Sequence, residues 1–303
     1  MSEVVSGRVW ERLACSFCGH SLERSGSGAR CPGCGLEYGY SRSGALDLRL
    51  KRPKKYPLDF ELGTPLLPEG GFRFAPLEMN SAPEVDYRQA QAPRHLTREM
   101  LSYFPRARAE HSLMLDLGCG GGIHRAACEQ AGYEWVGLDY DAAGAQILGD
   151  AHALPFLDET FDFVLCVTVL QYIRYPFVAT TEMQRVLKPG GKLIGTVAFL
   201  EPSHGTSFYH HTQLGAYNSL QFAGFTVEKL APSERWGVLT ALANMGLFYR
   251  MPDALAEALV LPLRLLHELW WQAGGWLTRR DLRDVRLRNF TGSFTFVASK
   301  GPC

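Results

Sequence analysis

The sequence has no excess of charge of either sign and no long uninterrupted apolar run. Its 303 residues include 31 Lys plus Arg and 31 Asp plus Glu, so the formal net charge is zero. A chain that binds nucleic acid over a wide surface is usually more basic, so this balance weakly disfavours that class of partner. No segment of about 18 apolar residues is present, which predicts that no helix crosses a membrane.

The first ten residues, Met1 to Trp10, also lack the basic start and apolar stretch of a secretory signal peptide. Without an export signal, the eight cysteines point to a reducing compartment, and we expect a cytoplasmic protein whose thiols bind metal or pack in the core. Hydrophobic residues make up 46% of the chain, which is enough for a sizeable core. The length suits one substantial α/β domain and one smaller module.

Composition divides the chain into three parts. Residues 1–50 hold four cysteines and many glycines and serines, whereas residues 51–83 are punctuated by prolines, which favour an extended linker. From 84 to 303, short apolar segments alternate with helical ones, which is typical of a doubly wound, Rossmann-like parallel sheet. A Leu- and Trp-rich helical insertion at about 233–290 precedes the last strand.

The apolar pattern also predicts individual elements. Residues 161–168 are almost continuously apolar, as expected for a strand that is covered on both faces. We expect helices at 95–104, 123–131, 180–187 and 213–223. We expect strands at 112–117, 133–138, 161–168, 192–199, 225–230 and 292–299.

Two Cys-x-x-Cys pairs, separated by twelve residues, lie in the first part of the chain. They comprise Cys15, Cys18, Cys31 and Cys34. Each pair places two thiolates on one turn, and two pairs complete a tetrahedral four-sulfur site for a structural Zn²⁺. The alternative is two disulfides or free thiols, which the expected compartment disfavours.

A glycine-rich turn follows the strand expected at 112–117. It reads Asp116-Leu117-Gly118-Cys119-Gly120-Gly121-Gly122, and glycine lets the backbone turn sharply while a ligand comes close. Asp139 ends the next strand, where a carboxylate can accept hydrogen bonds from both ribose hydroxyls of a nucleoside. Asp116 would repel a pyrophosphate but can accept from an α-amino group, which favours a nucleoside that carries an amino acid over a dinucleotide.

Four motifs, taken in order, resemble those of the class I S-adenosylmethionine-dependent methyltransferases. They are Leu115 to Gly122, Val136 to Asp139, Gly149 to Phe156 followed by Phe161 to Val164, and Arg185 to Gly191. The resemblance covers about residues 90–230. It implies that Asp150 accepts from the adenine amino group, that the Ala151 amide faces the ring, and that Val167 and Thr168 lie near the methyl-bearing sulfonium. The residues expected to bind this cofactor are Asp116, Gly118, Cys119, Gly120, Asp139, Tyr140, Asp150, Ala151 and Val167.

The chain departs from the usual pattern of that family in two places. Only ten residues separate Asp139 from Asp150, so a loop, and not a helix, should cover the adenine side. Leu170-Gln171-Tyr172 stands where the family often has Leu-Glu-His, so no role of that Glu or His is transferred. Residues 36–48 are similar to zinc ribbons that are fused to, or partner, methyltransferases.

Candidate acid–base groups cluster in the loop after the strand expected at 192–199. Residues 201–211 include three histidines, a tyrosine and a glutamate at the sheet edge where ligands bind in such folds. We name His204, Tyr209 and His210 as candidate catalytic residues. The alternatives are that His210 and His211 only begin the helix that follows at Thr212, and that positioning supplies much of the acceleration so that no general base is needed.

The apolar insertion allows two interpretations. In residues 254–271, Leu255, Leu259, Leu263, Leu266 and Trp270 fall on one helical face that Pro262 should kink. The helices could pack on the sheet or form a homodimer interface. They could instead act as a lid or as a peripheral membrane contact for a lipid-linked acceptor, with nearby arginines meeting lipid phosphates.

Three functions are consistent with these features. The favoured one is O- or N-methylation of a small-molecule or lipid-linked biosynthetic intermediate. The second is methylation of an RNA base, with the zinc ribbon holding the RNA. The third is a non-catalytic module that binds the cofactor. Neutral charge and the apolar insertion favour the first function, and the ribbon favours the second.

Overall fold

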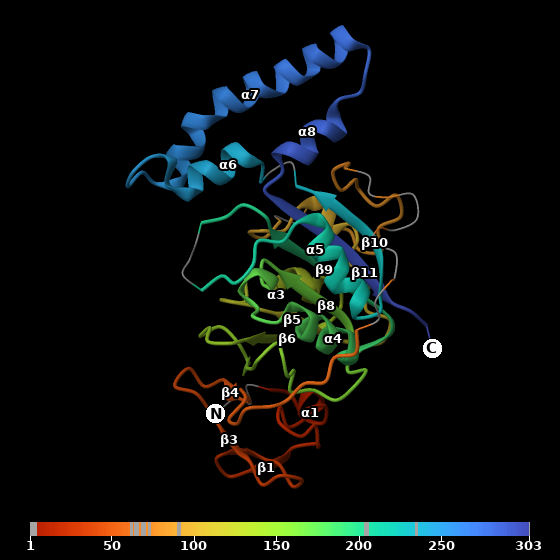
Figure 1. Ribbon diagram of the computed structural model, residues 1–303. Coiled ribbons are helices and arrows are strands. Elements are labelled where there is room, and N and C mark those ends of the chain that lie inside the picture. The colour runs from red at the N-terminus through yellow and green to blue at the C-terminus, as the bar shows by residue number, and fades with distance from the viewer. Residues whose placement is uncertain are drawn as a thin grey trace.

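The computed structural model describes residues 5–60, 63, 67, 71, 74–89, 92–202, 206–233 and 236–302. Within them, the chain forms a three-stranded sheet of order β1-β2-β3 and an eight-stranded sheet of order β10-β11-β9-β8-β5-β6-β7-β4. The small sheet lies at one end of the large one, and the helical insertion lies at the other end (Figure 1).

The large sheet is doubly wound, as the alternation of apolar segments predicts. Six neighbouring strands run parallel, and one antiparallel pair completes the edge. The parallel strands are β4 (Leu46–Asp47), β5 (Leu113–Leu117), β6 (Glu134–Asp139), β7 (Ile147–Leu148), β8 (Phe161–Val167) and β9 (Leu187–Ala198). The antiparallel pair is β10 (Phe225–Pro232) and β11 (Ser293–Lys300). The central strands are buried on both faces, which accounts for their continuous apolar sequence.

The helices beside the large sheet are short. They are α2 (Arg98–Leu101), α3 (Arg125–Gln130), α4 (Pro176–Val186) and α5 (Gln213–Phe222), with a 3-10 turn, η1 (Leu170–Tyr172), after β8. The prediction of a helix from residue 95 is wrong at its start. His95 has a left-handed backbone (φ 67°), and the Thr97 side chain caps α2 by accepting from the Met100 amide.

The cysteine-rich part joins the large sheet directly. It contains α1 (Gly7–Trp10), β1 (Glu23–Ser25), β2 (Gly28–Arg30) and β3 (Glu37–Gly39). Its last strand, β4, pairs in parallel with β7, with Leu46 opposite Ile147. The Ala14 amide donates to the Pro155 carbonyl at 3.0 Å. The two parts therefore share one hydrophobic core.

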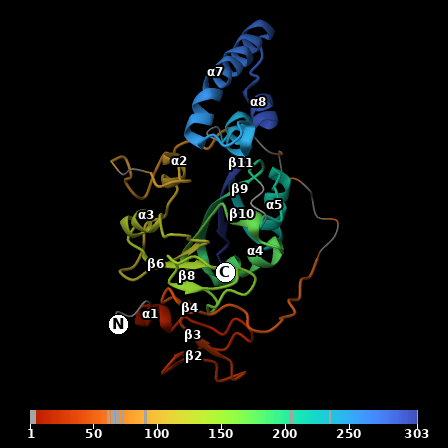
Figure 2. The same cartoon turned by 90° about the vertical axis from the view of Figure 1, so that its left-hand side faces the viewer.

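The insertion before β11 stands away from the sheet. It consists of α6 (Val238–Leu242), a π-helical turn η2 (Ala243–Leu247), the long α7 (Asp253–Thr278) and α8 (Arg283–Phe290). Helix α7 continues through Pro262 and packs against α6 and η2 rather than on the sheet. A second view shows α7 projecting from the molecule at the end opposite the small sheet (Figure 2).

Candidate functional site

The first cavity, of about 1040 Å³, lies at the carboxyl ends of β5, β6 and β8. This is the edge where ligands bind in open α/β sheets. Five of the residues expected to bind the cofactor line it: Gly118, Asp139, Tyr140, Asp150 and Ala151.

The glycine turn after β5 has the conformation that requires glycine. Gly118 and Gly120 have left-handed backbones, with φ of 71° and 52°. A Cβ at Gly118 would lie 2.3 Å from a methyl carbon of Val169, whereas a Cβ at Gly120 would meet no protein atom within 4 Å. The turn is therefore tight against the protein at Gly118 and open at Gly120, as a cradle for a ligand must be.

The Asp139 carboxylate organises the backbone around this turn. One oxygen accepts from the Gly120 amide at 3.0 Å, and the other accepts from the Asp141 and Ala142 amides at 3.1 Å. The chain between β6 and β7 is a loop of turns and bends without a helix, as the short spacing predicts. It packs on the glycine turn so closely that a Cβ at Gly144 would lie 2.7 Å from the Gly120 carbonyl oxygen.

Asp150 is held by a chain of hydrogen bonds. His152 donates to Asp150 Oδ1 through its amide at 2.9 Å and through Nδ1 at 2.6 Å. Its Nε2 accepts from the Tyr175 amide at 3.0 Å, which assigns the proton to Nδ1. Burial raises the pKa of Asp150, but these bonds from His152 outweigh it and hold the pKa below 3.8. Asp150 is therefore an ionised acceptor with a fixed orientation.

The segment after β4 crosses the first cavity. Its residues Leu50, Lys54, Tyr56 and Leu58 are part of the lining. The Tyr56 hydroxyl donates to buried Glu182 at 3.1 Å, and Lys54 Nζ donates to the Ser16 carbonyl at 2.9 Å. We call residues 50–58 the strap, because they connect the cysteine-rich part to the wall of the cavity.

Three further residues expected at the cofactor lie beneath the cavity wall. Asp116, Cys119 and Val167 are buried, and none of them lines the first cavity. Asp116 accepts from Trp135 Nε1 at 3.1 Å and lies 3.6 Å from His124 Nδ1. A buried carboxylate needs such partners. The sequence suggests contact of Asp116 with an α-amino group, and the structure adds a role in supporting the turn.

A second cavity, of about 610 Å³, adjoins the first. Thr168 and Tyr172 line both cavities and so form the wall between them. The lining combines the segment before α2, the ends of β9 and β11, and the insertion; it includes His95, Thr196, Glu201, Trp236, Asn244 and Asp253.

Two residues of the second cavity hold unusual backbone conformations. His95 and Thr168 have φ of 67° and 55°, and a left-handed conformation is costly for a β-branched residue such as Thr168. The Thr168 amide donates to the Thr196 carbonyl and hydroxyl at 3.2 and 3.1 Å, which holds it there. Partial desolvation, together with Arg94 and His124, lowers the pKa of the largely exposed His95 below 6.5, so its imidazole is neutral at pH 7.

Of the three residues predicted from the sequence to be catalytic, one lies outside the described residues and two lie on the surface. His204 falls outside the described residues. Tyr209 and His210 are exposed, and neither lines either cavity. Glu201, in the same loop, does line the second cavity. Sequence reasoning did not single out His95, because it lies near the start of an expected helix and no motif surrounds it.

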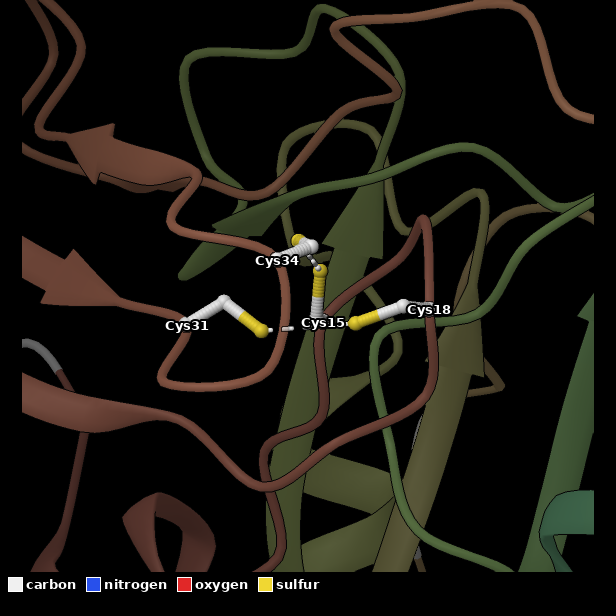
Figure 3. A group of neighbouring side chains, drawn as sticks. All are labelled: Cys15, Cys18, Cys31 and Cys34. Atoms are coloured by element: carbon white, nitrogen blue, oxygen red, sulfur yellow. Dashed lines mark hydrogen bonds between the residues drawn. The ribbon is translucent and has the colours of Figure 1, made fainter.

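The four paired cysteines converge into one cluster (Figure 3). Their sulfurs all lie within 4.8 Å of one another, with Cys15 and Cys34 3.7 Å apart and Cys18 and Cys31 3.4 Å apart. Sulfurs at about 2.3 Å from a tetrahedral zinc ion are about 3.8 Å apart, so the cluster fits that ion. The Tyr38 hydroxyl lies beside the cluster, 3.1 Å from the Cys15 sulfur. Cys119, Cys128 and Cys166 are buried packing residues.

Comparison with known proteins agrees with this geometry. Residues 115–195, which span β5 to β9 and include the glycine turn, Asp139 and Asp150, match the family described as a methyltransferase domain. Residues 115–195 are therefore a methyltransferase domain, of the class I S-adenosylmethionine-dependent kind. All four motifs of the resemblance lie within the matched residues.

The methyltransferase domain has relatives of several kinds. An uncharacterized methyltransferase of Mycobacterium leprae is 33% identical over 95 residues, or 27% of this chain and 35% of that protein. The demethylmenaquinone methyltransferase of Renibacterium salmoninarum is 36% identical over 103 residues, or 30% of this chain and 43% of that protein. The chain therefore spans less than half the length of these two curated relatives. A methyltransferase structure from Bacillus halodurans aligns with a TM-score of 0.44 at 17% identity, covering 64% of this chain and 95% of that one.

Proposed function

We propose that this methyltransferase binds S-adenosylmethionine in the first cavity and methylates an oxygen or nitrogen atom of a small-molecule or lipid-linked intermediate in the second. The observation that carries the proposal is the adjacency of the two cavities across Thr168 and Tyr172. A donor site and an acceptor site must meet at one point for in-line methyl transfer, and these two share a wall.

The residues of the first cavity suit each part of this cofactor. The glycine turn, open at Gly120, would receive the amino-acid end, and Asp139 would accept from the ribose hydroxyls. Asp150, fixed by His152, would accept from the adenine amino group, and Tyr140 would cover the ring. When bound, the cofactor supplies a methyl group on a positively charged sulfur. The chain's part is to orient the two reactants and exclude water.

The second cavity suits a compact acceptor group. Its volume of about 610 Å³ lies in the ordinary range for small-molecule sites. None of its described lining residues comes from the cysteine-rich part, which lies at the other end of the sheet. A ribbon that held RNA for this cavity would have to act across the width of the sheet, so the position favours a small acceptor group over an RNA base.

His95 is the residue best placed to receive a proton from the acceptor. It lines the second cavity. Its backbone is left-handed just before α2 begins, and this conformation sets the position of the imidazole. A neutral imidazole at pH 7 can act as a general base for a hydroxyl or an ammonium acceptor. Glu201 and Asn244 supply polar partners for binding the same group.

The cysteine cluster would hold a structural zinc ion in the reducing cytoplasm. All four ligand positions of such a site are filled by thiolates, so the ion takes no part in the chemistry. Its function would be to hold the small sheet together and, through β4 and the strap, to support the first cavity.

Transfer of labelled methyl groups into fractionated cell extract tests the proposal. Label in the lipid or small-molecule fraction, with mass spectrometry to locate the methylated atom, supports it. Label in RNA would overturn the acceptor class, and binding of cofactor without transfer into any fraction would identify a non-catalytic module.

A further inference from the structure

Helix α7 turns its apolar face to solvent. Leu255, Leu259, Leu263, Leu266, Trp270 and Leu277 fall within an arc of about 80° at 3.6 residues per turn. All six are at least half exposed, from 50% at Leu259 to 79% at Trp270. A surface helix of a globular protein normally buries such a face, so this arc has no partner among the described residues.

A second face of α7, which begins about 20° beyond the edge of this arc, meets the rest of the insertion. Ala256 and Val260 are its buried residues, and they pack beside Phe248 and Met251. Charged groups lie on this inner side as well: Glu268 pairs with Arg286 of α8 at 3.7 Å. The helix is therefore held in place by one face and leaves a continuous apolar arc on the other.

The length and composition of α7 suit a helix that lies along a membrane surface. Its 26 residues extend for about 39 Å. Yet no described helix is long and apolar enough to span a bilayer. An amphipathic helix with leucine and tryptophan on one face binds instead in the plane of the interface. Trp270 and Trp276, both about 80% exposed, have the amphipathic rings favoured at that depth.

Arginines at the end of α7 supply the charge that an anionic surface would attract. Residues 279–290 contain five arginines and two aspartates, for a net charge of +3. Arg279, Arg280, Arg283 and Arg288 are exposed. They follow directly after the apolar arc, so a surface with acyl chains and negatively charged headgroups would engage both features together.

The base of the same helix forms part of the second cavity. Asp253, the first residue of α7, and Asn244 of η2 line that cavity together with Trp236. We infer that α7 binds the surface of an anionic lipid bilayer and brings a lipid-borne methyl acceptor to the second cavity. The inferred membrane contact depends only on the exposed surface of α7, whereas the identity of the acceptor rests on the proposed function.

Co-sedimentation of the full chain with vesicles tests this inference. Phosphatidylcholine vesicles with and without phosphatidylglycerol serve as the probe. We expect binding to vesicles that contain phosphatidylglycerol and a reduction of about ten-fold in the bound fraction for Leu266→Glu/Trp270→Glu. Arg279→Glu/Arg280→Glu should lower binding only to the anionic vesicles. The control is Leu214→Glu, which changes an exposed leucine of α5 and should bind as the wild type does.

Three outcomes would overturn the inference. They are failure of the wild type to bind anionic vesicles, equal binding by Leu266→Glu/Trp270→Glu, and a dimer seen by light scattering that this double substitution dissociates without any vesicle binding. The last result would assign the face to a second copy of the chain. Calorimetry with S-adenosylmethionine on the same variants should be unchanged, because the substituted residues do not line the first cavity. Loss of vesicle binding is thus distinct from failure of the proposed function.

Discussion

At the residue scale, the chain from Tyr175 through His152 to Asp150 connects the start of α4 with the first cavity. Its hydrogen bonds give the Asp150 carboxylate one orientation and keep it ionised above pH 3.8. Because the folded pKa of Asp150 is lowered, the stability that these bonds contribute is present above that pH and is lost as the pH falls through the folded value.

Removing the His152 side chain should weaken cofactor binding without unfolding the protein. His152→Ala deletes a hydrogen bond to a charged group, worth about 1.5 kcal/mol, and the dissociation constant for S-adenosylmethionine should rise roughly ten-fold. Isothermal calorimetry measures this change. His111→Ala, at a half-exposed histidine that lines neither cavity, should bind as the wild type does. Equal affinity for His152→Ala would show that the orientation of Asp150 does not matter.

The pH dependence of methyl transfer should report on His95. Its pKa lies below 6.5, so the imidazole is neutral at pH 7 and becomes protonated only as the pH falls below that value. The transfer rate should therefore be level from pH 7 to 8 and decrease below pH 6.5. His95→Asn, which tolerates the left-handed backbone, should lower the rate about 100-fold and remove this decrease. A variant that keeps both the rate and its pH profile would exclude His95 as the base.

At the element scale, β4 and the strap make the cysteine-rich part a structural component of the methyltransferase domain. β4 extends the large sheet beside β7, and the Ala14 amide bonds to Pro155, next to the loop that holds Asp150. The cysteine cluster that would hold zinc begins one residue later, at Cys15. Loss of the metal should therefore disturb the cofactor site as well as the small sheet.

Substitution of one metal ligand tests this connection. Cys15→Ser should release zinc, lower the melting temperature by at least about 5 °C and weaken S-adenosylmethionine binding. Chelation of the wild type should have the same effects, and added zinc should reverse them in the wild type but not in the variant. Elemental analysis measures the zinc loss. Unchanged cofactor affinity after complete loss of zinc would show that cofactor binding does not depend on the metal site.

The sequence predicts those elements whose residues interact locally. The apolar segments at 113–117 and 161–167 and the glycine turn at Gly118 are strongly patterned, and the structure confirms them. The four-sulfur cluster is predictable because two Cys-x-x-Cys pairs at this spacing are typical of such a site. The pairing of β4 with β7 is not predictable, since two-residue strands carry no periodic signal. The place of His95 in the second cavity is not predictable either, because it depends on a left-handed turn and on contacts between distant segments.

At the scale of the whole molecule, the two additions to the domain lie at opposite ends of the large sheet. The small sheet lies at one end and the insertion at the other (Figures 1 and 2). The strap lines the first cavity, whereas Asn244 and Asp253 of the insertion line the second. Under the proposed function, the cysteine-rich end would support the cofactor and the helical end would hold the acceptor. Methyl transfer would take place between them, at the wall formed by Thr168 and Tyr172.

Calorimetric titration of S-adenosylmethionine into the full, zinc-loaded chain tests whether the first cavity is the cofactor site. We expect binding of one cofactor per chain, with a loss of affinity of at least roughly ten-fold for both Asp139→Ala and Asp150→Ala, and no loss for Asp158→Ala, an exposed aspartate outside both cavities. Absence of binding, or binding that neither Asp139→Ala nor Asp150→Ala weakens, would contradict this assignment.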